Sequence, residues 1–269
     1  MHSRPRKPRL IALLVAALAG APSFAATITV APGEVAVDAG NGRCSLREAI
    51  LNAESDSDES GGDCVAGAGA DTIELAAGST YTLTNAQLYL SASTGLPGIR
   101  STLTVNGNGA TIERDRTLFI AEACDNGPGF RLLQIGDIGN LTLRNATLRY
   151  GCAAQAGGAI HNHGTLVLED VRVVENAAFA SAGAIQNDNA LTLVRRTVGN
   201  NRVVNGAGGG IVSTGTLTVE ASTIQANSTP GSGGGLLTSS GSRGTSTAML
   251  VNSTLSGNQS DGLGGGAHL

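Results

Sequence analysis

The chain has 269 residues, of which 39 are glycine and only 3% are aromatic, with no tryptophan. Four of its 17 Lys and Arg residues lie in the segment 1–25, which holds no acid. The rest of the chain therefore carries 13 cations against 21 Asp and Glu, a net charge of −8. An acidic surface repels phosphate backbones, which argues against nucleic acid as a partner. Many glycines and few large side chains favour tight turns and closely stacked strands.

The segment 1–25 has the pattern of a secretory signal peptide. Four cations precede an apolar run at 10–19, and the small residues Ser23 and Ala25 precede the predicted cleavage site after Ala25. The run is shorter than the roughly 20 apolar residues that a membrane-spanning helix needs. We therefore expect an exported protein with no membrane-spanning segment once the signal is removed.

All four cysteines follow the predicted signal: Cys44, Cys64, Cys124 and Cys152. An even number of cysteines in a compartment that permits oxidation predicts two disulfides. Order along the chain favours the first with the second and the third with the fourth, although the sequence leaves the other two pairings open. Metal binding is the alternative, but no C-x-x-C occurs, and His161 and His163 lack a matched pair of thiols.

A short helix is predicted directly after the first cysteine. Ser45 and Glu48 have the S-x-x-E spacing of a capping box. Apolar residues follow at the i, i+3, i+4 and i+7 spacing of one helix face: Leu46, Ala49, Ile50 and Ala53. We expect residues 26–100 to form an N-terminal cap and the first coils, with the helix covering an edge that would otherwise invite aggregation.

The helix is followed by an acidic stretch at 54–63, which we expect to form a solvated loop closed by a bridge between the first two cysteines. Calcium binding is the weaker alternative, because Asp56, Asp58, Glu59 and Asp63 lie close in sequence but do not have the spacing of an EF-hand. No other metal or cofactor is expected.

Residues 101–269 contain a repeat. A strand-like segment starts at Leu141 and recurs from Leu166, Leu191 and Leu217, and more loosely from Ala248. The interval between starts is nearly constant except for the last, which is longer because a small polar loop is inserted at 239–244. Alternation of apolar and polar residues predicts strands. A period near 25 with short strands predicts the coils of an all-β parallel β-helix, in which stacking buries a continuous core.

Two further landmarks share this register. Glycine-rich tetrads begin at Gly157, Ala182, Gly208, Gly233 and Gly264. Asparagines lie ten residues after the strand starts of the second to fifth copies: Asn176, Asn201, Asn227 and Asn258. The first copy has Gly151 there. We expect these asparagines to stack as a structural ladder at a corner, each amide bonded to the next coil. Asparagine also tolerates the left-handed backbone that a sharp corner needs.

Two motifs resemble known families. Cys44-Ser45-Leu46-Arg47-Glu48-Ala49, followed by Asp71-Thr72-Ile73-Glu74-Leu75, resembles the CSLREA motif near the start of many secreted bacterial proteins. The coils resemble the repeats of the polymorphic outer membrane proteins, which combine G-G-A-I with F-x-x-N. Residues 157–160 match the first element, whereas the phenylalanine of the second is replaced by Val173, Val198, Ile224 and Leu255. Together the resemblances imply a right-handed parallel β-helix of the pectin-lyase-like type on a secreted or surface-exposed protein.

No catalytic residues are assigned from the sequence. Sugar hydrolysis needs two carboxylates that converge on one bond, but Glu169 and Glu220 are separated by a coil with Val194 at the equivalent position. His161 and His163 could act as a general base, yet we expect them at a polar turn before Gly164. The charged segment at 113–116 is expected to be a solvated loop.

The main functional hypothesis is an adhesin-like binding scaffold, secreted to the periplasm or the outer surface of a Gram-negative-type bacterium, with a protein or polysaccharide on a surface as its ligand. The alternative is a polysaccharide-active, pectate-lyase-like enzyme whose site is divergent or completed by sequence after Leu269. Because the fifth repeat stops at 264–269 without a capping element, we expect a chain that is truncated or uncapped at this end.

Overall fold

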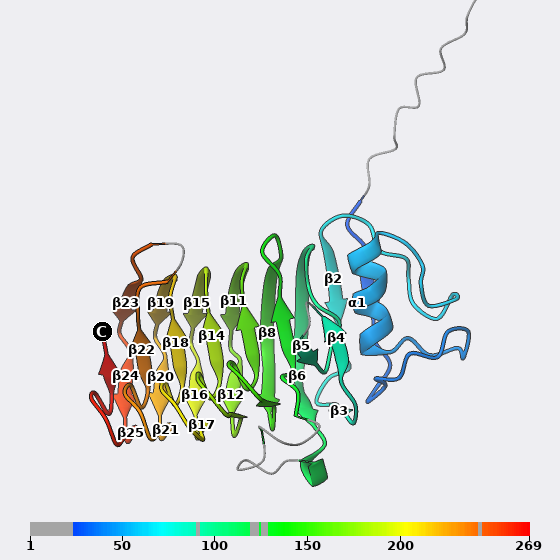
Figure 1. Ribbon diagram of the computed structural model, residues 1–269. Helices are drawn as coiled ribbons and strands as arrows, with labels where there is room; N and C mark the ends of the chain where they lie inside the picture. The colour runs from blue at the N-terminus through cyan, green and yellow to red at the C-terminus, as the bar shows by residue number, and fades with distance from the viewer. Residues whose placement is uncertain (1–23, 90–91, 119–123, 125–128, 242–243) are drawn as a thin grey trace, which may run out of the picture.

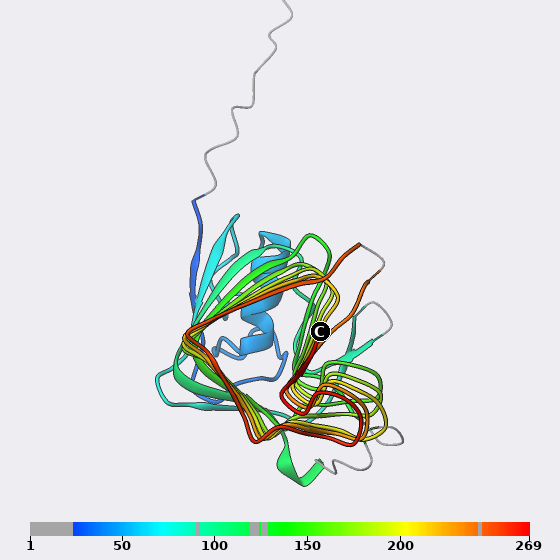
Figure 2. The same ribbon diagram turned by 90° about the vertical axis from the view of Figure 1, so that its left-hand side faces the viewer.

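The computed structural model of the chain describes residues 24–89, 92–118, 124, 129–241 and 244–269, so most of the predicted signal peptide lies outside the described residues. Parallel strands follow one another in coils along a single axis (Figure 1). Viewed along this axis, the later coils superimpose closely (Figure 2). The chain is a parallel β-helix, as the repeat predicts. The right-handed sense that the resemblance implies stays a prediction.

Three parallel sheets form the walls of the stack. The largest contains thirteen strands: β1 (Thr27–Thr29), β2 (Asp71–Glu74), β3 (Thr80–Leu83), β6 (Thr102–Arg114), β8 (Asn140–Arg149), β11 (Thr165–Glu169), β12 (Arg172–Val174), β15 (Ala190–Val194), β16 (Thr197–Gly199), β19 (Thr216–Glu220), β20 (Thr223–Gln225), β23 (Thr247–Val251) and β24 (Thr254–Ser256). The second contains β7 (Leu133–Ile135), β10 (Ile160–Asn162), β14 (Ile185–Asn187), β18 (Ile211–Ser213), β22 (Leu236–Thr238) and β26 (Ala267–His268). The third contains β9 (Cys152–Ala153), β13 (Ala177–Ala178), β17 (Arg202–Val203), β21 (Ser228–Thr229) and β25 (Gln259–Ser260). A separate antiparallel pair is formed by β4 (Gln87–Tyr89) and β5 (Ala92–Thr94).

The register of the coils follows the repeat in the sequence. The five strand starts at Leu141, Leu166, Leu191, Leu217 and Ala248 are paired in succession across neighbouring strands. In β8, β11, β15 and β19, the apolar residues at the first and third positions of the alternation are buried, so that Leu166 and Leu168 are fully buried while Val167 is not. In β23, on the last coil, the equivalent Leu250 is 38% exposed. Each coil therefore contributes rows of aliphatic side chains to one continuous core.

The one α-helix among the described residues, α1 (Leu46–Ser55), lies across the N-terminal end of the stack (Figures 1 and 2). Its capping box is present: the Glu48 backbone N–H donates to Ser45 Oγ, and the Ser45 N–H donates to Glu48 Oε2. The predicted apolar face is buried. Arg47 is 5% exposed and ties the helix to the first coils, because its guanidinium donates to the Gly95 carbonyl and to both oxygens of Asn85.

The four asparagines at the corner form a continuous hydrogen-bonded row. The amide nitrogen of Asn176 donates to Oδ1 of Asn201 at 3.0 Å, and the bonds from Asn201 to Asn227 and from Asn227 to Asn258 are both 2.9 Å. Each Oδ1 also accepts the backbone N–H of the equivalent residue in the preceding coil, which for Asn176 is Gly151. The row thus satisfies backbone groups that the corner removes from the sheets.

The left-handed backbone of the corner does not lie at these asparagines, although asparagine tolerates it. The positive φ values fall on the residue before each asparagine: Glu175 (57°), Asn200 (55°), Ala226 (51°) and Gly257 (61°). The corner turns one residue earlier, because the asparagine must keep an orientation that points its amide inward.

Two disulfides are formed, Cys44–Cys64 and Cys124–Cys152, and they pair the cysteines in chain order. The first joins the start of α1 to the end of the acidic loop, and the second joins residue 124 to β9. Disulfides of this kind are typical of proteins outside the cytoplasm. Within the described residues, no helix is long and apolar enough to cross a membrane.

Candidate functional site

Several acids of the coils are engaged with arginines of the adjacent coil. Oxygen–nitrogen distances are 2.8 Å for Glu169–Arg144 and 2.9 Å for Asp170–Arg195. The register also confirms that Val194 lies between Glu169 and Glu220. These contacts run from coil to coil along the outside of the stack, so the carboxylates do not face one another across a substrate-sized gap.

The expectation of a solvated loop at 113–116 is wrong for the first half of that segment, Glu113 and Arg114. It lies at the end of β6 and beyond it, where Glu113 pairs with Arg149 at 2.6 Å. Arg114 is 1% exposed, and its guanidinium carbon lies 5.1 Å from the centre of the Phe130 ring. Strand alternation turns Arg114 inward, so burial in the stack overrides the preference of a charged side chain for water. Only Asp115 and the residues after it leave the strand.

The carboxylates of the acidic loop after α1 accept hydrogen bonds from the loop itself and from the segments beside it. Asp63 accepts three backbone N–H groups from residues 40–42, and Asp58 accepts both the N–H and the hydroxyl of Ser60. Asp56 accepts the N–H of Gly69. Since these carboxylates point to separate backbone groups, they do not converge on a common point where a calcium ion would lie.

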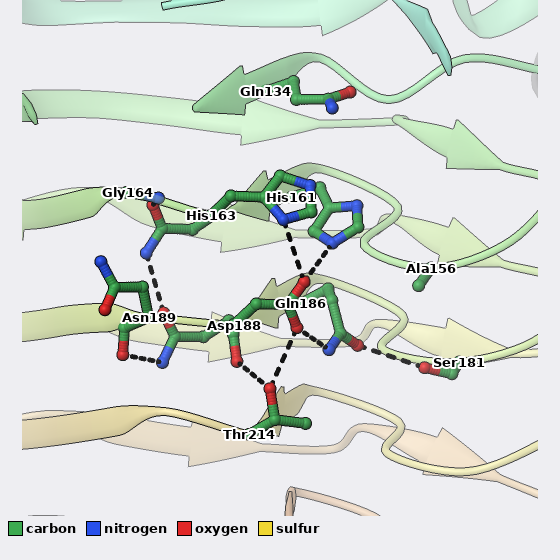
Figure 3. Close-up of polar contacts among 12 residues, drawn as sticks. Gln134, Ala156, His161, His163, Gly164, Ser181, Gln186, Asp188, Asn189 and Thr214 are labelled. Atoms are coloured by element: carbon green, nitrogen blue, oxygen red, sulfur yellow. Dashed lines mark hydrogen bonds and ion pairs between the residues drawn. The ribbon is translucent and has the colours of Figure 1, made fainter. Parts of the chain in front are cut away.

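Two histidines and one aspartate converge on the second sheet (Figure 3). His161 lies on β10, His163 follows it at the bend, and Asp188 follows β14 on the next coil. Oδ2 of Asp188 is 2.8 Å from Nε2 of His161 and 3.2 Å from Nδ1 of His163. The two imidazole centroids are 4.0 Å apart. All three side chains are partly buried.

The position of Asp188 is fixed through its other oxygen. Oδ1 accepts a hydrogen bond from Nε2 of Gln186 at 2.7 Å and from Oγ1 of Thr214 at 3.1 Å. Gln186 is oriented in turn by the hydroxyl of Ser181, which donates to its Oε1. Side chains from its own coil and from the next coil therefore aim Oδ2 at the two imidazoles of the preceding coil (Figure 3).

The surroundings determine the charges of the cluster. Burial is the main cause that lowers the pKa of His161, and His163 and Arg131 reinforce the effect against the opposing hydrogen bond to Asp188. Burial alone would raise the pKa of Asp188, but hydrogen bonds from His161, His163 and Gln186 outweigh it and hold that pKa below its ordinary range. At neutral pH we therefore take the His161–Asp188 contact as a neutral N–H bonded to a carboxylate rather than as an ion pair.

The cluster opens into a surface recess of about 430 Å³, which we call the recess. Its lining residues are Ala92, Arg131, Gln134, Asp137, Gln155, His161 and His163. Arg131 is 5% exposed and donates to Oε1 of Gln134 at 2.7 Å and to the Ala156 carbonyl at 3.1 Å. The ionisable side chains of the recess thus come from two neighbouring coils, those of β7 and β10.

The sequence-based account of the histidines was incomplete. His163 does lie at the bend before Gly164, but His161 belongs to a strand. The missing partner was a carboxylate, not a thiol. A signal for it was present, because Asp188 follows His163 by one period of the repeat. The same period also relates Asn162 to Asn187, whose amides form a second buried contact of 2.8 Å that the sequence analysis missed.

Acidification is expected to destabilise the protein through His161. Because its pKa in the folded state is lowered, the unfolded chain takes up a proton more readily, so the free energy of unfolding falls as the pH drops below about 7. Urea denaturation between pH 7.5 and 5.5, in the presence of a chelator, measures this slope. His161→Gln keeps a donor toward Asp188 but cannot titrate, and its profile should be flatter. Parallel profiles for the two proteins would contradict the assignment.

In comparisons with known proteins, no family model, no curated protein and no solved structure matches this chain. The parallel β-helix and the residues of the recess therefore carry the functional argument on their own.

Proposed function

We propose that the protein is a binding scaffold on the cell surface, in the manner of an adhesin, which presents the recess and the outer faces of its coils to a polymeric ligand. The observation that supports this proposal most is the coil-to-coil pairing of acids with arginines, as in Glu169–Arg144 and Asp170–Arg195. In these pairs the carboxylates join neighbouring coils to each other. A stacked solenoid also offers a long, regular face to an extended partner.

The motifs support the same proposal. The CSLREA-like segment, in which Arg47 and Glu48 are buried, covers the N-terminal end of the stack. The repeats resemble those of polymorphic outer membrane proteins, and the two disulfides are typical of an oxidising compartment. From these features we infer that the protein lies at the outer surface of a Gram-negative-type bacterium.

Surface labelling of intact cells tests this function. Antibodies against the purified protein should label cells that express the full chain without permeabilisation. Labelling that requires a permeabilised outer membrane would contradict an adhesin role. A periplasmic protein stained under the same two conditions provides the control for membrane integrity.

A second candidate function is favoured by the composition of the recess. Arg131, Asp137, His161 and His163 line one hollow, and such groups can act as bases or acids on a sugar polymer. A polysaccharide-active enzyme would shorten polygalacturonate during incubation. A scaffold should leave the length of the polymer unchanged, and its own mobility should fall in an electrophoresis gel that contains the polymer. Chain shortening that His161→Gln abolishes would replace the scaffold proposal.

A further inference from the structure

We propose that Nε2 of His161, Nδ1 of His163 and Oδ2 of Asp188 bind a divalent transition-metal ion, with zinc as the best match. The proposal goes beyond the scaffold function and does not depend on it. Among the described residues, this is the group of three or more His, Cys, Asp and Glu side chains whose ligand atoms come close enough to share one ion.

The donor atoms have the spacing that a metal requires. All three lie within 4.8 Å of one another. The carboxylate oxygen is 2.8 Å and 3.2 Å from the two nitrogens. Ligands about 2.0–2.2 Å from a tetrahedral zinc ion lie roughly 3.3–3.6 Å from each other. Small side-chain rotations would therefore convert the hydrogen-bonded trio into a ligand set.

The chemistry of the donors selects the class of ion. Imidazole nitrogens suit zinc, copper, nickel and iron, whereas calcium and magnesium prefer sites built from oxygen alone. Two histidines and one carboxylate provide three ligands, which is the protein-derived count of zinc sites that keep one position open. The recess lies beside the cluster, so the open position can accept water or an anionic group of a bound polymer.

The outer contacts of the site resemble those that support metal ligands. In such sites, hydrogen bonds from neighbouring groups hold a ligating carboxylate in one orientation. Here Gln186 and Thr214 both donate to Oδ1 of Asp188, at 2.7 and 3.1 Å, and leave Oδ2 for the shared point. The backbone is equally fixed, because His163 and Asp188 directly follow the paired residues Asn162 and Asn187 of β10 and β14. The ligands are thus held in place by the stack itself.

The competing arrangement needs no metal. Nε2–H of His161 and Nδ1–H of His163 would each donate to Asp188 Oδ2, and hydrogen bonds alone would hold the three side chains together. The two arrangements place the same atoms together but differ in whether zinc binds and at what stoichiometry.

Equilibrium dialysis of the full chain, purified without a histidine tag, against zinc chloride distinguishes them. We expect about one zinc ion per chain. Cobalt bound in place of zinc should show the visible absorption of a four-coordinate site, with three protein ligands and one open position. His163→Ala and Asp188→Asn should each weaken zinc binding by about 10-fold or more. His268→Ala removes a histidine at the far end of the stack and should bind zinc as the wild type does. Calcium chloride should give no binding at this site.

Circular dichroism of each variant establishes that it is folded before its affinity is compared. If either ligand variant does not fold, Thr214→Val takes its place, since it leaves all three ligands intact but removes one support of Asp188 and should weaken zinc binding by several-fold. Absence of zinc from the wild type, or equal affinity in the wild type, His163→Ala and Asp188→Asn, would overturn the proposal. Zinc binding is read independently of surface labelling, so the failure of one proposal does not imply the failure of the other.

Discussion

Replacing Asn201 with alanine is expected to lower the free energy of unfolding by about 3 kcal/mol and the melting temperature by about 10 °C. The side chain is fully buried. Its amide nitrogen donates to Oδ1 of Asn227 and to the Val173 carbonyl, and its Oδ1 accepts from the backbone and side-chain nitrogens of Asn176. Alanine leaves these partners inside the corner without a hydrogen bond, and each such buried group costs about 1–3 kcal/mol.

Asn205→Ala is the matched control for this prediction. Asn205 belongs to the same coil but is exposed, so the change should alter the free energy of unfolding by less than about 0.5 kcal/mol. Urea denaturation of the three proteins under identical conditions makes the comparison. Equal effects of the two substitutions would mean that the row of asparagines does not contribute to the stability of the stack.

Replacing Arg47 with alanine is expected to destabilise the N-terminal cap by about 2–3 kcal/mol. Burial lowers the pKa of the guanidinium, but it remains charged. Its three hydrogen bonds, at 2.9, 2.7 and 2.6 Å, join α1 to Gly95 and Asn85. Hydrogen bonds from a charged donor contribute about 1.5–3 kcal/mol each, and the exposed Asn85 can recover part of this loss by binding water.

Two variants show whether this effect depends on the planar fork of the guanidinium. Arg47→Lys keeps the charge but can reach only part of the acceptor set, so it should restore less than half of the loss. Arg43→Ala removes a side chain that is 58% exposed and pairs with Glu34 at 3.5 Å, and it should cost less than about 0.5 kcal/mol. Thermal unfolding with hydrogen exchange of α1 measures the cap directly. An Arg47→Ala protein with unaltered exchange in α1 would contradict the assignment.

The stacking of the coils could be predicted because the repeat fixes register directly. The interval between one strand start and the next, in the series from Leu141 to Leu217, is the length of one coil. Residues one period apart therefore become neighbours in the same sheet. The alternation within each strand then determines which side chains enter the core. Neither step depends on the details of the turns.

The candidate site was harder to predict because it combines residues from different coils. His161 and His163 stand out in the sequence, but no matched pair of thiols accompanies them there. Asp188 becomes a neighbour only when the period of the repeat is applied to polar residues as well as to leucines and asparagines. The burial of Arg114 was missed for a related reason: a run of alternating charges is typical of a loop, yet strand alternation directed this side chain inward.

The recess is lined by ionisable side chains, and two of these, His161 and His163, belong to the proposed metal site. X-ray diffraction at the zinc absorption edge, from crystals of the protein grown with zinc chloride, tests this most directly. We predict one anomalous peak about 2.0–2.2 Å from His161 Nε2, His163 Nδ1 and Asp188 Oδ2. Crystals in which the three side chains remain joined only by hydrogen bonds, with no peak between them, would contradict the account.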